Sequence, residues 1–123
     1  MLLVDDDPVI LRVLELNFRL EGFEVSTAAY GAEALERARA DKPDAVILDV
    51  LMPGLDGYDV AGRIRADVDL SSTHLVFLTG RAPDDAGSMR AGFEDVDRVS
   101  KPFDPIALVR LVRSRVEATE ARG

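Results

Sequence analysis

Ala45-Val46-Ile47-Leu48-Asp49 is the most informative stretch of this 123-residue chain, because four apolar residues follow one another and an acid closes the run. A strand that is apolar at every position is buried on both faces, as in a parallel sheet covered by helices. On both sides of this run lie segments whose apolar residues repeat with the period of a helix, and further short apolar runs follow on the far side of those segments. The chain is therefore expected to be one α/β domain built around this strand.

Five apolar runs are expected to form the strands, and segments of helical period alternate with them. The expected strands are Leu2–Val4, Phe23–Thr27, Ala45–Leu48, Leu75–Leu78 and Val96–Ser100. The expected helices are Pro8 to just before Gly22, Gly31–Ala40, Tyr58–Arg65, Pro83–Ala91 and a last helix from Pro105. Met52 to Gly57 is expected to be a turn-rich loop. The domain is predicted to cover residues 1–118, with a frayed polar end at 119–123.

Each expected helix has an apolar stripe that should face the sheet. In the first helix the inward residues are expected to be Ile10, Val13, Leu14 and Phe18, and in the last helix Ile106, Val109, Val112 and Val116. In the second and third helices they are Ala34, Leu35, Ala38, Ala61 and Ile64. Helix starts follow from Asp7-Pro8 and Asp104-Pro105, where an acid caps and proline takes the first position.

Composition excludes several classes of function. There are 23 Asp and Glu against 15 Lys and Arg, a net charge of -8, which argues against binding to nucleic acid phosphates. With no cysteine and one histidine, His74, there is no disulfide framework, thiol nucleophile or multi-histidine metal site. No apolar run approaches the length that spans a bilayer, so a reducing cytoplasm is the expected compartment, with no membrane partner.

Polar residues gather where the expected strands end. Asp5 and Asp6 follow the first strand and Asp49 the third, whereas Thr79 ends the fourth and Lys101 follows the fifth. Because the carboxyl ends of parallel strands meet at one edge of a sheet, these side chains should converge there. His74 begins a strand and should lie away from them, and Asp7 is expected only to cap a helix.

Three crowded carboxylates need a cation, and their hard oxygens suit Mg²⁺. An aspartate can also attack a phosphoryl group to give an acyl phosphate. Asp49 is the candidate for that role, with the Lys101 ammonium and the Thr79 hydroxyl near the phosphoryl oxygens. The residues thus predict Mg²⁺-dependent phosphoryl chemistry at this edge.

Four motifs resemble the receiver domain of two-component response regulators. They are Val-Asp-Asp at 4–6, Pro-Asp-Ala-Val-Ile-Leu-Asp-Val-Leu-Met-Pro-Gly-Leu-Asp-Gly at 43–57, Leu-Thr-Gly at 78–80 and Lys-Pro-Phe at 101–103. The resemblance implies a flavodoxin-like, doubly wound sheet of five parallel strands in the order 2-1-3-4-5, with five helices. It also implies a phosphorylation-dependent signalling switch in the manner of chemotaxis regulators, and not an enzyme.

By the same resemblance Asp49 is the phospho-acceptor. Asp5 and Asp6 form the acid pair, with Asp6 the more direct metal ligand, and Mg²⁺ is also held by Asp49 and the backbone carbonyl of Leu51. Phosphorylation would come from a sensor histidine kinase or a phosphotransfer protein. The downstream partner would be an effector or a fused output domain.

The resemblance also assigns the switch region to Thr79, Gly80 and Arg98. Thr79 and Lys101 would contact the phosphoryl oxygens, and Lys101-Pro102 would be a cis peptide. Receivers commonly carry Tyr or Phe three residues before the lysine, where this chain has Arg98. A guanidinium is costly to bury without a partner, so Arg98 is expected to stay outward and the response to pass through Thr79 and the loop after it.

Two other functions remain open at the level of sequence. An Mg²⁺-dependent aspartyl-phosphate phosphohydrolase would normally carry a second acid two residues beyond its nucleophile, where this chain has Leu51. A receiver-like binding module without phosphotransfer is suggested by Arg98 and opposed by the intact acidic cluster. A homodimer is also considered, through the face of the fourth helix, fifth strand and last helix.

Overall fold

The computed structural model describes residues 1–52, 54–80 and 92–122, with residues 119–122 described as helical backbone alone. One parallel sheet has the strand order β2-β1-β3-β4-β5. Its strands are β1 (Leu2–Val4), β2 (Ser26–Ala28), β3 (Ala45–Asp49), β4 (His74–Thr79) and β5 (Asp97–Ser100). The expected flavodoxin-like α/β fold, including its strand order, is confirmed.

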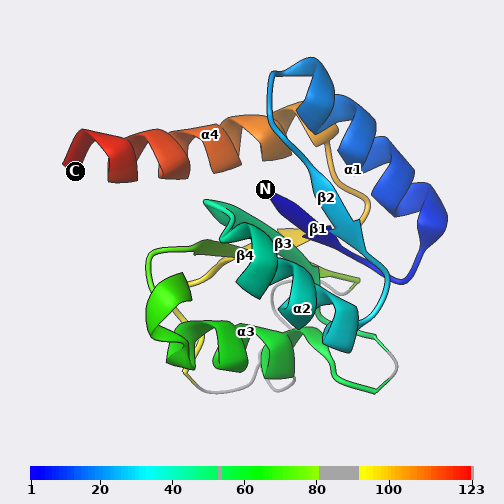
Figure 1. Cartoon of the computed structure of the whole chain (residues 1–123). Coiled ribbons are helices and arrows are strands. Elements are labelled where there is room, and N and C mark those ends of the chain that lie inside the picture. Colours follow the sequence, from blue (N-terminus) through cyan, green and yellow to red (C-terminus); the bar gives the residue numbers. More distant parts are fainter. Residues whose placement is uncertain (53, 81–91, 123) are drawn as a thin grey trace.

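The described residues contain four α-helices and one short 3₁₀ helix. They are α1 (Pro8–Leu20), α2 (Gly31–Asp41), α3 (Gly57–Ala66), η1 (Val68–Leu70) and α4 (Pro105–Arg122). The further helix expected at Pro83–Ala91 lies outside the described residues. Figure 1 shows α1 and α4 on one face of the sheet and α2 and α3 on the other.

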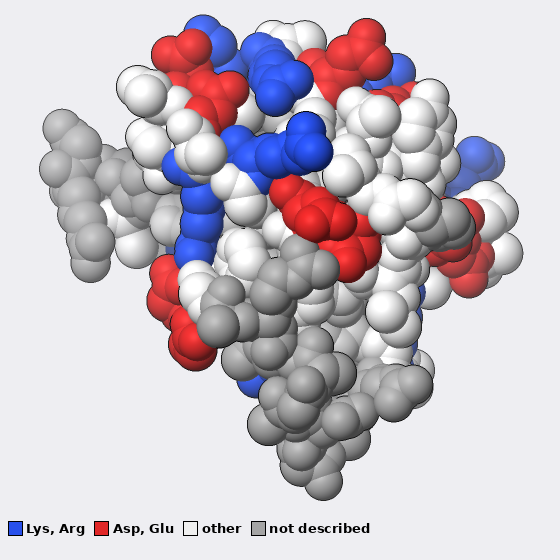
Figure 2. Space-filling model, turned by 90° about the horizontal axis from the view of Figure 1, so that it is seen from below, with Lys and Arg blue, Asp and Glu red and all other residues white. Residues whose placement is uncertain are grey.

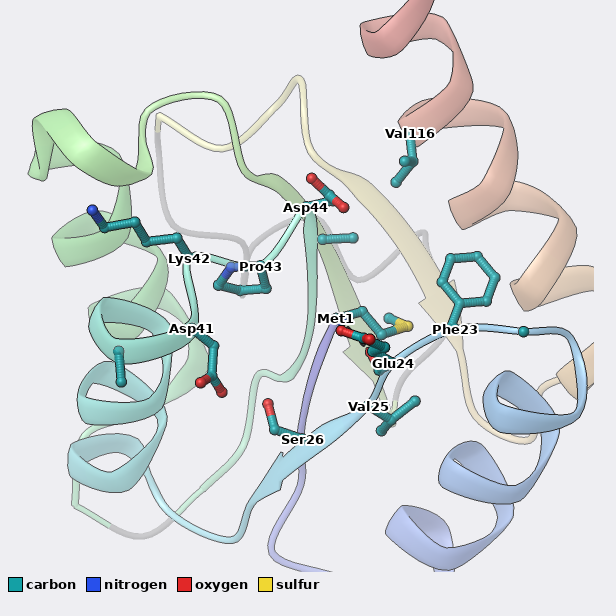
Figure 3. A pocket seen from close by; sticks show the side chains of 13 residues that line it. Met1, Phe23, Glu24, Val25, Ser26, Asp41, Lys42, Pro43, Asp44 and Val116 are labelled. Carbon is teal, nitrogen blue, oxygen red and sulfur yellow. Dashed lines mark hydrogen bonds between the residues drawn. The ribbon is translucent and has the colours of Figure 1, made fainter.

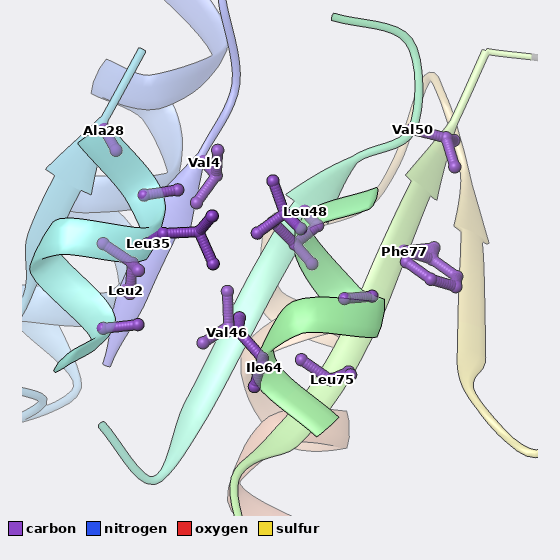
Figure 4. Close-up of a cluster of buried hydrophobic side chains, with 14 of the residues drawn as sticks. Leu2, Val4, Ala28, Leu35, Val46, Leu48, Val50, Ile64, Leu75 and Phe77 are labelled. Atoms are coloured by element: carbon purple, nitrogen blue, oxygen red, sulfur yellow. The ribbon is translucent and has the colours of Figure 1, made fainter. Parts of the chain in front are cut away.

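Side chains of β3 alternate between the two faces of the sheet and are buried on both. Val46 and Leu48 pack in the cluster beneath α2 and α3, which Figure 4 shows with Leu35 and Ile64. Ile47 packs in the second cluster, with residues of α1 and α4. Burial of β3 on both sides explains the unbroken apolar run, and it places Asp49 at the end of the most enclosed strand.

Two of the expected inward residues are exposed, which corrects the prediction. Val13 in α1 is 38% exposed and Ile106 in α4 is 59% exposed. Leu11 packs on the core from α1 instead, and Leu108 is buried in α4. Apolar residues lie all round both helices in the sequence, so only packing selects the buried face. The other expected inward residues are buried or packed against the core: Ile10, Leu14, Phe18, Ala34, Leu35, Ala38, Ala61, Ile64, Val109, Val112 and Val116.

The second strand is shorter than predicted and begins at Ser26 instead of Phe23. The Phe23 amide donates to the Phe18 carbonyl (3.0 Å) and so belongs to the turn that ends α1. The Phe23 ring packs edge-on against Phe18, with centroids 5.3 Å apart. The Ser26 amide donates to the Met1 carbonyl (2.9 Å), which begins the pairing with β1.

The remaining boundaries lie close to their predicted positions. α3 begins one residue early, at Gly57, with Asp56 as its N-cap, and β5 begins one residue late, at Asp97. α4 continues as a helix to Arg122, so the domain limit at residue 118 stays a prediction. Within the described ranges, no helix has the length and apolar character needed to cross a membrane.

Candidate functional site

The carboxyl edge of the sheet brings together the polar residues that the sequence singled out. Asp5 follows β1, Asp49 ends β3, Thr79 ends β4 and Lys101 follows β5. Asp5, Asp6 and Asp49 each offer one carboxylate oxygen, and these three oxygens lie within 4.8 Å of one another. The predicted convergence is therefore confirmed for the acids.

Lys101 holds the two buried acids together. Its Nζ lies 3.0 Å from Asp5 Oδ2 and 3.5 Å from Asp49 Oδ2. The Lys101 amide donates to the Thr79 carbonyl (2.7 Å), and this hydrogen bond holds the backbone of Lys101, just after β5, against the end of β4. The Lys101-Pro102 peptide is cis, as expected. One ammonium thus faces two carboxylates, with Thr79 half-buried at the neighbouring strand end.

The chemistry of this group fits a divalent cation with hard oxygen ligands. Among the described residues the buried charged side chains are Asp5, 0% exposed, and Asp49, 4% exposed. Asp5 Oδ1 accepts from the Asp7 amide (2.9 Å) and Asp49 Oδ1 from the Leu51 amide (3.2 Å). Asp5 Oδ2 is at ion-pair distance from Lys101, yet no described residue donates a hydrogen bond to it in good geometry. A buried carboxylate oxygen left in this state is a ligand suited to Mg²⁺.

The pKa values of the site reflect this crowding. Burial, and then the nearby charge of Asp5, raise the pKa of Asp49 to about 6, against the opposing effects of the Leu51 amide and Lys101. Partial burial disfavours the charged form of Lys101, but Asp5 and Asp49 outweigh it, so the pKa of Lys101 is raised. Without a metal ion, the charged form of Asp49 is therefore disfavoured, and a bound cation would stabilise that charged form.

The other predicted residues lie as follows. Asp6 is exposed at the rim of the cluster, and the Leu51 side chain is 66% exposed just beyond Asp49. Arg98 is exposed on β5, as expected. Asp7 accepts from the Val9 amide (2.9 Å) and caps α1, so it serves the helix as predicted. His74 begins β4 at the opposite edge, where it pairs with the start of β3, and Gly80 is exposed after β4.

Gly57 is a residue that the sequence analysis did not assign to the site. The sequence predicts it as the last residue of the turn-rich loop from Met52 to Gly57. It is instead the buried first residue of α3, and its backbone lies directly against Asp49 and Val50. An aspartate that can cap a helix, followed by glycine just after a buried strand, is the signal that could have identified it.

A cavity of about 900 Å³ lies at the other edge of the sheet and is separate from this site. Figure 3 shows Met1, Ser26 and Asp44 at the amino ends of strands, with Val116 of α4 above them. On the molecular face seen in Figure 2, acidic and basic side chains lie near one another in several places. The described residues also form ion pairs, among them Arg65–Asp95 (2.8 Å) and Arg115–Asp97 (2.8 Å).

Comparisons with known proteins agree on one family. The model of the response regulator receiver domain matches residues 1–113. The DNA-binding response regulator MtrA of Mycolicibacterium smegmatis is 38% identical over 98% of this chain and 51% of its own length. The transcriptional regulatory protein CseB of Streptomyces coelicolor is 40% identical over 93% of this chain and 47% of its own length. The chain thus spans about half the length of these curated relatives.

Solved structures give the same picture. A response regulator receiver domain protein from Clostridium thermocellum has a TM-score of 0.85 and 25% identity, covering 99% of this chain and 97% of that one. The chemotaxis protein CheY4 of Vibrio cholerae has a TM-score of 0.82 and 28% identity, covering 92% and 94%.

Proposed function

Since the chain belongs to the response regulator receiver domain family, whose members are signalling switches of two-component systems, we propose that Asp49 is its phospho-acceptor. The observation that carries this proposal is the position of Asp49. It is a buried carboxylate at the end of the central strand, with one oxygen 3.5 Å from an ammonium and two further acids within reach of a shared cation. Asp5 also follows a strand at this edge and lies 3.0 Å from Lys101, but it is fully buried, whereas Asp49 retains 4% of its exposure.

In the proposed reaction an oxygen of Asp49 attacks the phosphorus atom of a phosphohistidine. The new bond joins aspartate oxygen to phosphorus, the bond from phosphorus to the imidazole nitrogen breaks, and its electron pair stays on that nitrogen. Lys101 neutralises charge on the phosphoryl oxygens, and the Thr79 hydroxyl is the proposed second contact. The product is an acyl phosphate on Asp49.

We assign Mg²⁺ as the cofactor of this site. Asp5, Asp6, Asp49 and the backbone carbonyl of Leu51 would hold the ion, with Asp6 the more direct ligand. When bound, Mg²⁺ supplies positive charge to the phosphoryl oxygens and offsets the repulsion among the acids. Asp5 Oδ2 accepts no hydrogen bond from a described residue, and oxygens of the three carboxylates lie within 4.8 Å of one another; both observations support this assignment.

The proposed partners follow from the family. The donor would be a sensor histidine kinase or a phosphotransfer protein in the cytoplasm. The output would reach an effector or a fused domain, since MtrA and CseB are described as DNA-binding and transcriptional regulators. A homodimer is also proposed through the face of β5, α4 and the helix expected at Pro83–Ala91, which lies outside the described residues. With Arg98 exposed, the response is proposed to start at Thr79 and Gly80, and the residues that follow, 81–91, lie outside the described residues.

The comparisons do not favour the two alternatives. The family model that matches this chain describes a receiver domain and does not indicate a hydrolase. The residue two positions beyond Asp49 is Leu51, whose exposed side chain has no carboxyl group to activate water. A binding module without phosphotransfer would have no evident use for the buried acids, which cost stability unless they are paired.

The test is labelling by acetyl phosphate in the presence of MgCl₂, followed by mass spectrometry and Phos-tag electrophoresis. Wild-type protein should gain one phosphoryl group on Asp49, and Asp49→Asn should gain none. Asp44→Asn is the matched control, because Asp44 is exposed at the amino end of the same strand. Equal labelling of Asp49→Asn and wild type would show that another residue is the acceptor, and continuous phosphate release without a labelled species would favour the hydrolase.

A further inference from the structure

The loop from Val50 to Asp56 connects the proposed phospho-acceptor to α3, and it carries the proposed Leu51 ligand. Two glycines on different helices lie against the two ends of this loop. Gly57 is the first residue of α3 and Gly31 is the first residue of α2, and both are buried. Neither has the left-handed backbone that would explain glycine by conformation, since the described glycines with positive φ are Gly22, Gly54 and Gly92.

Gly57 is required by space at the Asp49 end of the loop. Its amide donates to the Val50 carbonyl (3.2 Å). A Cβ at Gly57 would overlap the Asp49 carbonyl oxygen and lie 2.8 Å from Val50 Cα. Both neighbours are backbone atoms, so no side-chain rotation can relieve the overlap. A methyl group there must push α3 away from β3 or displace the backbone of Asp49.

Gly31 is required by space at the other end. A Cβ at Gly31 would lie 2.6 Å from Leu55 Cβ and 2.8 Å from the Leu55 carbonyl oxygen. It would also lie 3.2 Å from Val60 Cγ2 in α3. Relief again requires a backbone shift, here of the loop on which Leu55 lies. Gly31 therefore limits how far this loop can move toward α2.

We infer that Gly31 and Gly57 are positioning residues for the Mg²⁺ and phosphoryl site, because together they set the path of the loop from Asp49 to α3. Gly57 acts on Asp49 and Val50 through their backbone atoms, and Gly31 acts on Leu55, which lies just before α3. This inference rests on the proposed function of the site. Residues that orient metal ligands typically change metal affinity by about 10- to 100-fold when they are replaced.

A third glycine supplies the matched control. Gly62 lies within α3, and the nearest neighbour of a Cβ there is Phe93 Cζ at 3.9 Å, an ordinary contact. Gly62→Ala therefore adds the same methyl group to the same helix without displacing the loop. Val112→Ala is the stability control, because Val112 is fully buried in the cluster on the opposite face of the sheet.

The test is an MgCl₂ titration of each folded variant, with binding monitored by ¹⁵N NMR at a temperature well below the unfolding transition of that variant. The apparent Kd for Mg²⁺ is expected to rise about 10- to 100-fold in Gly57→Ala and in Gly31→Ala. Gly62→Ala and Val112→Ala should keep the wild-type Kd, although Val112→Ala melts at a lower temperature. Acetyl phosphate labelling of the two affected variants should recover toward the wild-type rate as MgCl₂ is raised.

A wild-type Kd in either folded variant would overturn the role of that glycine. A Val112→Ala variant that loses affinity equally would show that the effect is general loss of stability, and this too would overturn the inference. If Gly57→Ala does not fold, Gly31→Ala decides the result. Labelling of Asp49→Asn would instead contradict the proposed function, and the Mg²⁺ titration would still test the glycines separately.

Discussion

At the scale of single residues, the site is dominated by the cost of placing Asp5 and Asp49 inside the protein. Burial and the nearby charge of Asp5 disfavour the charged form of Asp49 and raise its pKa, and the Lys101 ammonium offsets only part of this. The arrangement is poor for stability alone, because a buried ion pair rarely repays its desolvation. It suits a site that receives a cation and a phosphoryl group.

The raised pKa of Asp49 predicts an unusual dependence of stability on pH. Without metal, the folded protein binds a proton at Asp49 near pH 6, whereas the unfolded chain binds it only near about pH 4. The contribution of this group to the free energy of unfolding is therefore present below about pH 4 and lost as pH rises through 6. Between pH 7 and pH 5 wild type should gain about 1 kcal/mol relative to Asp49→Asn.

Thermal unfolding in EDTA at the two pH values measures this difference. The comparison with Asp49→Asn removes the effects of other titrating groups, such as Asp95, whose pKa is lowered by its hydrogen bond from Arg65. Parallel pH profiles of the two proteins would contradict the raised pKa of Asp49.

Lys101→Ala should have opposite effects on stability and on metal affinity. Removing the ammonium leaves the buried Asp5 and Asp49 without their partner, so the metal-free protein should lose about 2 kcal/mol or more. The more negative cluster should bind Mg²⁺ more tightly, because the competing cation is gone. Calorimetric titration with MgCl₂ and thermal melts measure the two effects. Lys42→Ala, at an exposed lysine, is the control, and weaker Mg²⁺ binding by Lys101→Ala would refute this account.

At the scale of elements, α3 connects the site to the rest of the domain. Asp56 and Asp59 form a capping box at its start, where Gly57 contacts β3. At its end Arg65 donates to both carboxylate oxygens of Asp95 (2.8 Å each) and to the Gly92 carbonyl (2.8 Å). The helix therefore joins the backbone of Asp49, the proposed phospho-acceptor, to the residues that precede β5.

Gly62→Ala should stabilise α3. Glycine in a helix interior costs roughly 0.5 to 1 kcal/mol relative to alanine, and the added methyl group meets only Phe93 at 3.9 Å. The free energy of unfolding from urea denaturation should rise by about that amount. A decrease would mean that α3 cannot accept a methyl group on the side facing Phe93.

At the scale of the whole molecule, the sheet brings the ends of four strands, β1, β3, β4 and β5, together in one site. Residues as distant in sequence as Asp5 and Lys101 come within 3.0 Å because parallel strands in the order β2-β1-β3-β4-β5 all end at the same edge. The two apolar clusters on either face stabilise this sheet independently of the charges at its edge.

Binding of Mg²⁺ should therefore stabilise the whole domain by mass action. At a concentration ten times its Kd, the ion should raise the free energy of unfolding by about 1.4 kcal/mol. Melts with and without MgCl₂ measure the gain, and Asp6→Ala, which removes a proposed ligand from the exposed rim, should lose most of it. An equal gain in wild type and Asp6→Ala would place the ion elsewhere.

The sequence by itself determined the class of fold, the central strand and the identity of the acidic residues. These features depend on residues that are neighbours in the sequence. The apolar run from Ala45 to Leu48, followed by Asp49, indicates a buried strand and its polar end without tertiary information. The acids and Lys101 could be assigned to one edge because parallel strands leave no other arrangement.

Only the tertiary structure decided which faces of the helices are buried, where β2 begins and why two helices start with glycine. Val13 and Leu11 are both apolar, and the rotation of α1 against the sheet decides which of the two packs on the core. Gly31 and Gly57 touch segments that are distant along the chain or belong to another element, so their neighbours are not visible in the local sequence. Local patterns encode period and polarity, whereas close approach between backbones exists only once the elements have packed.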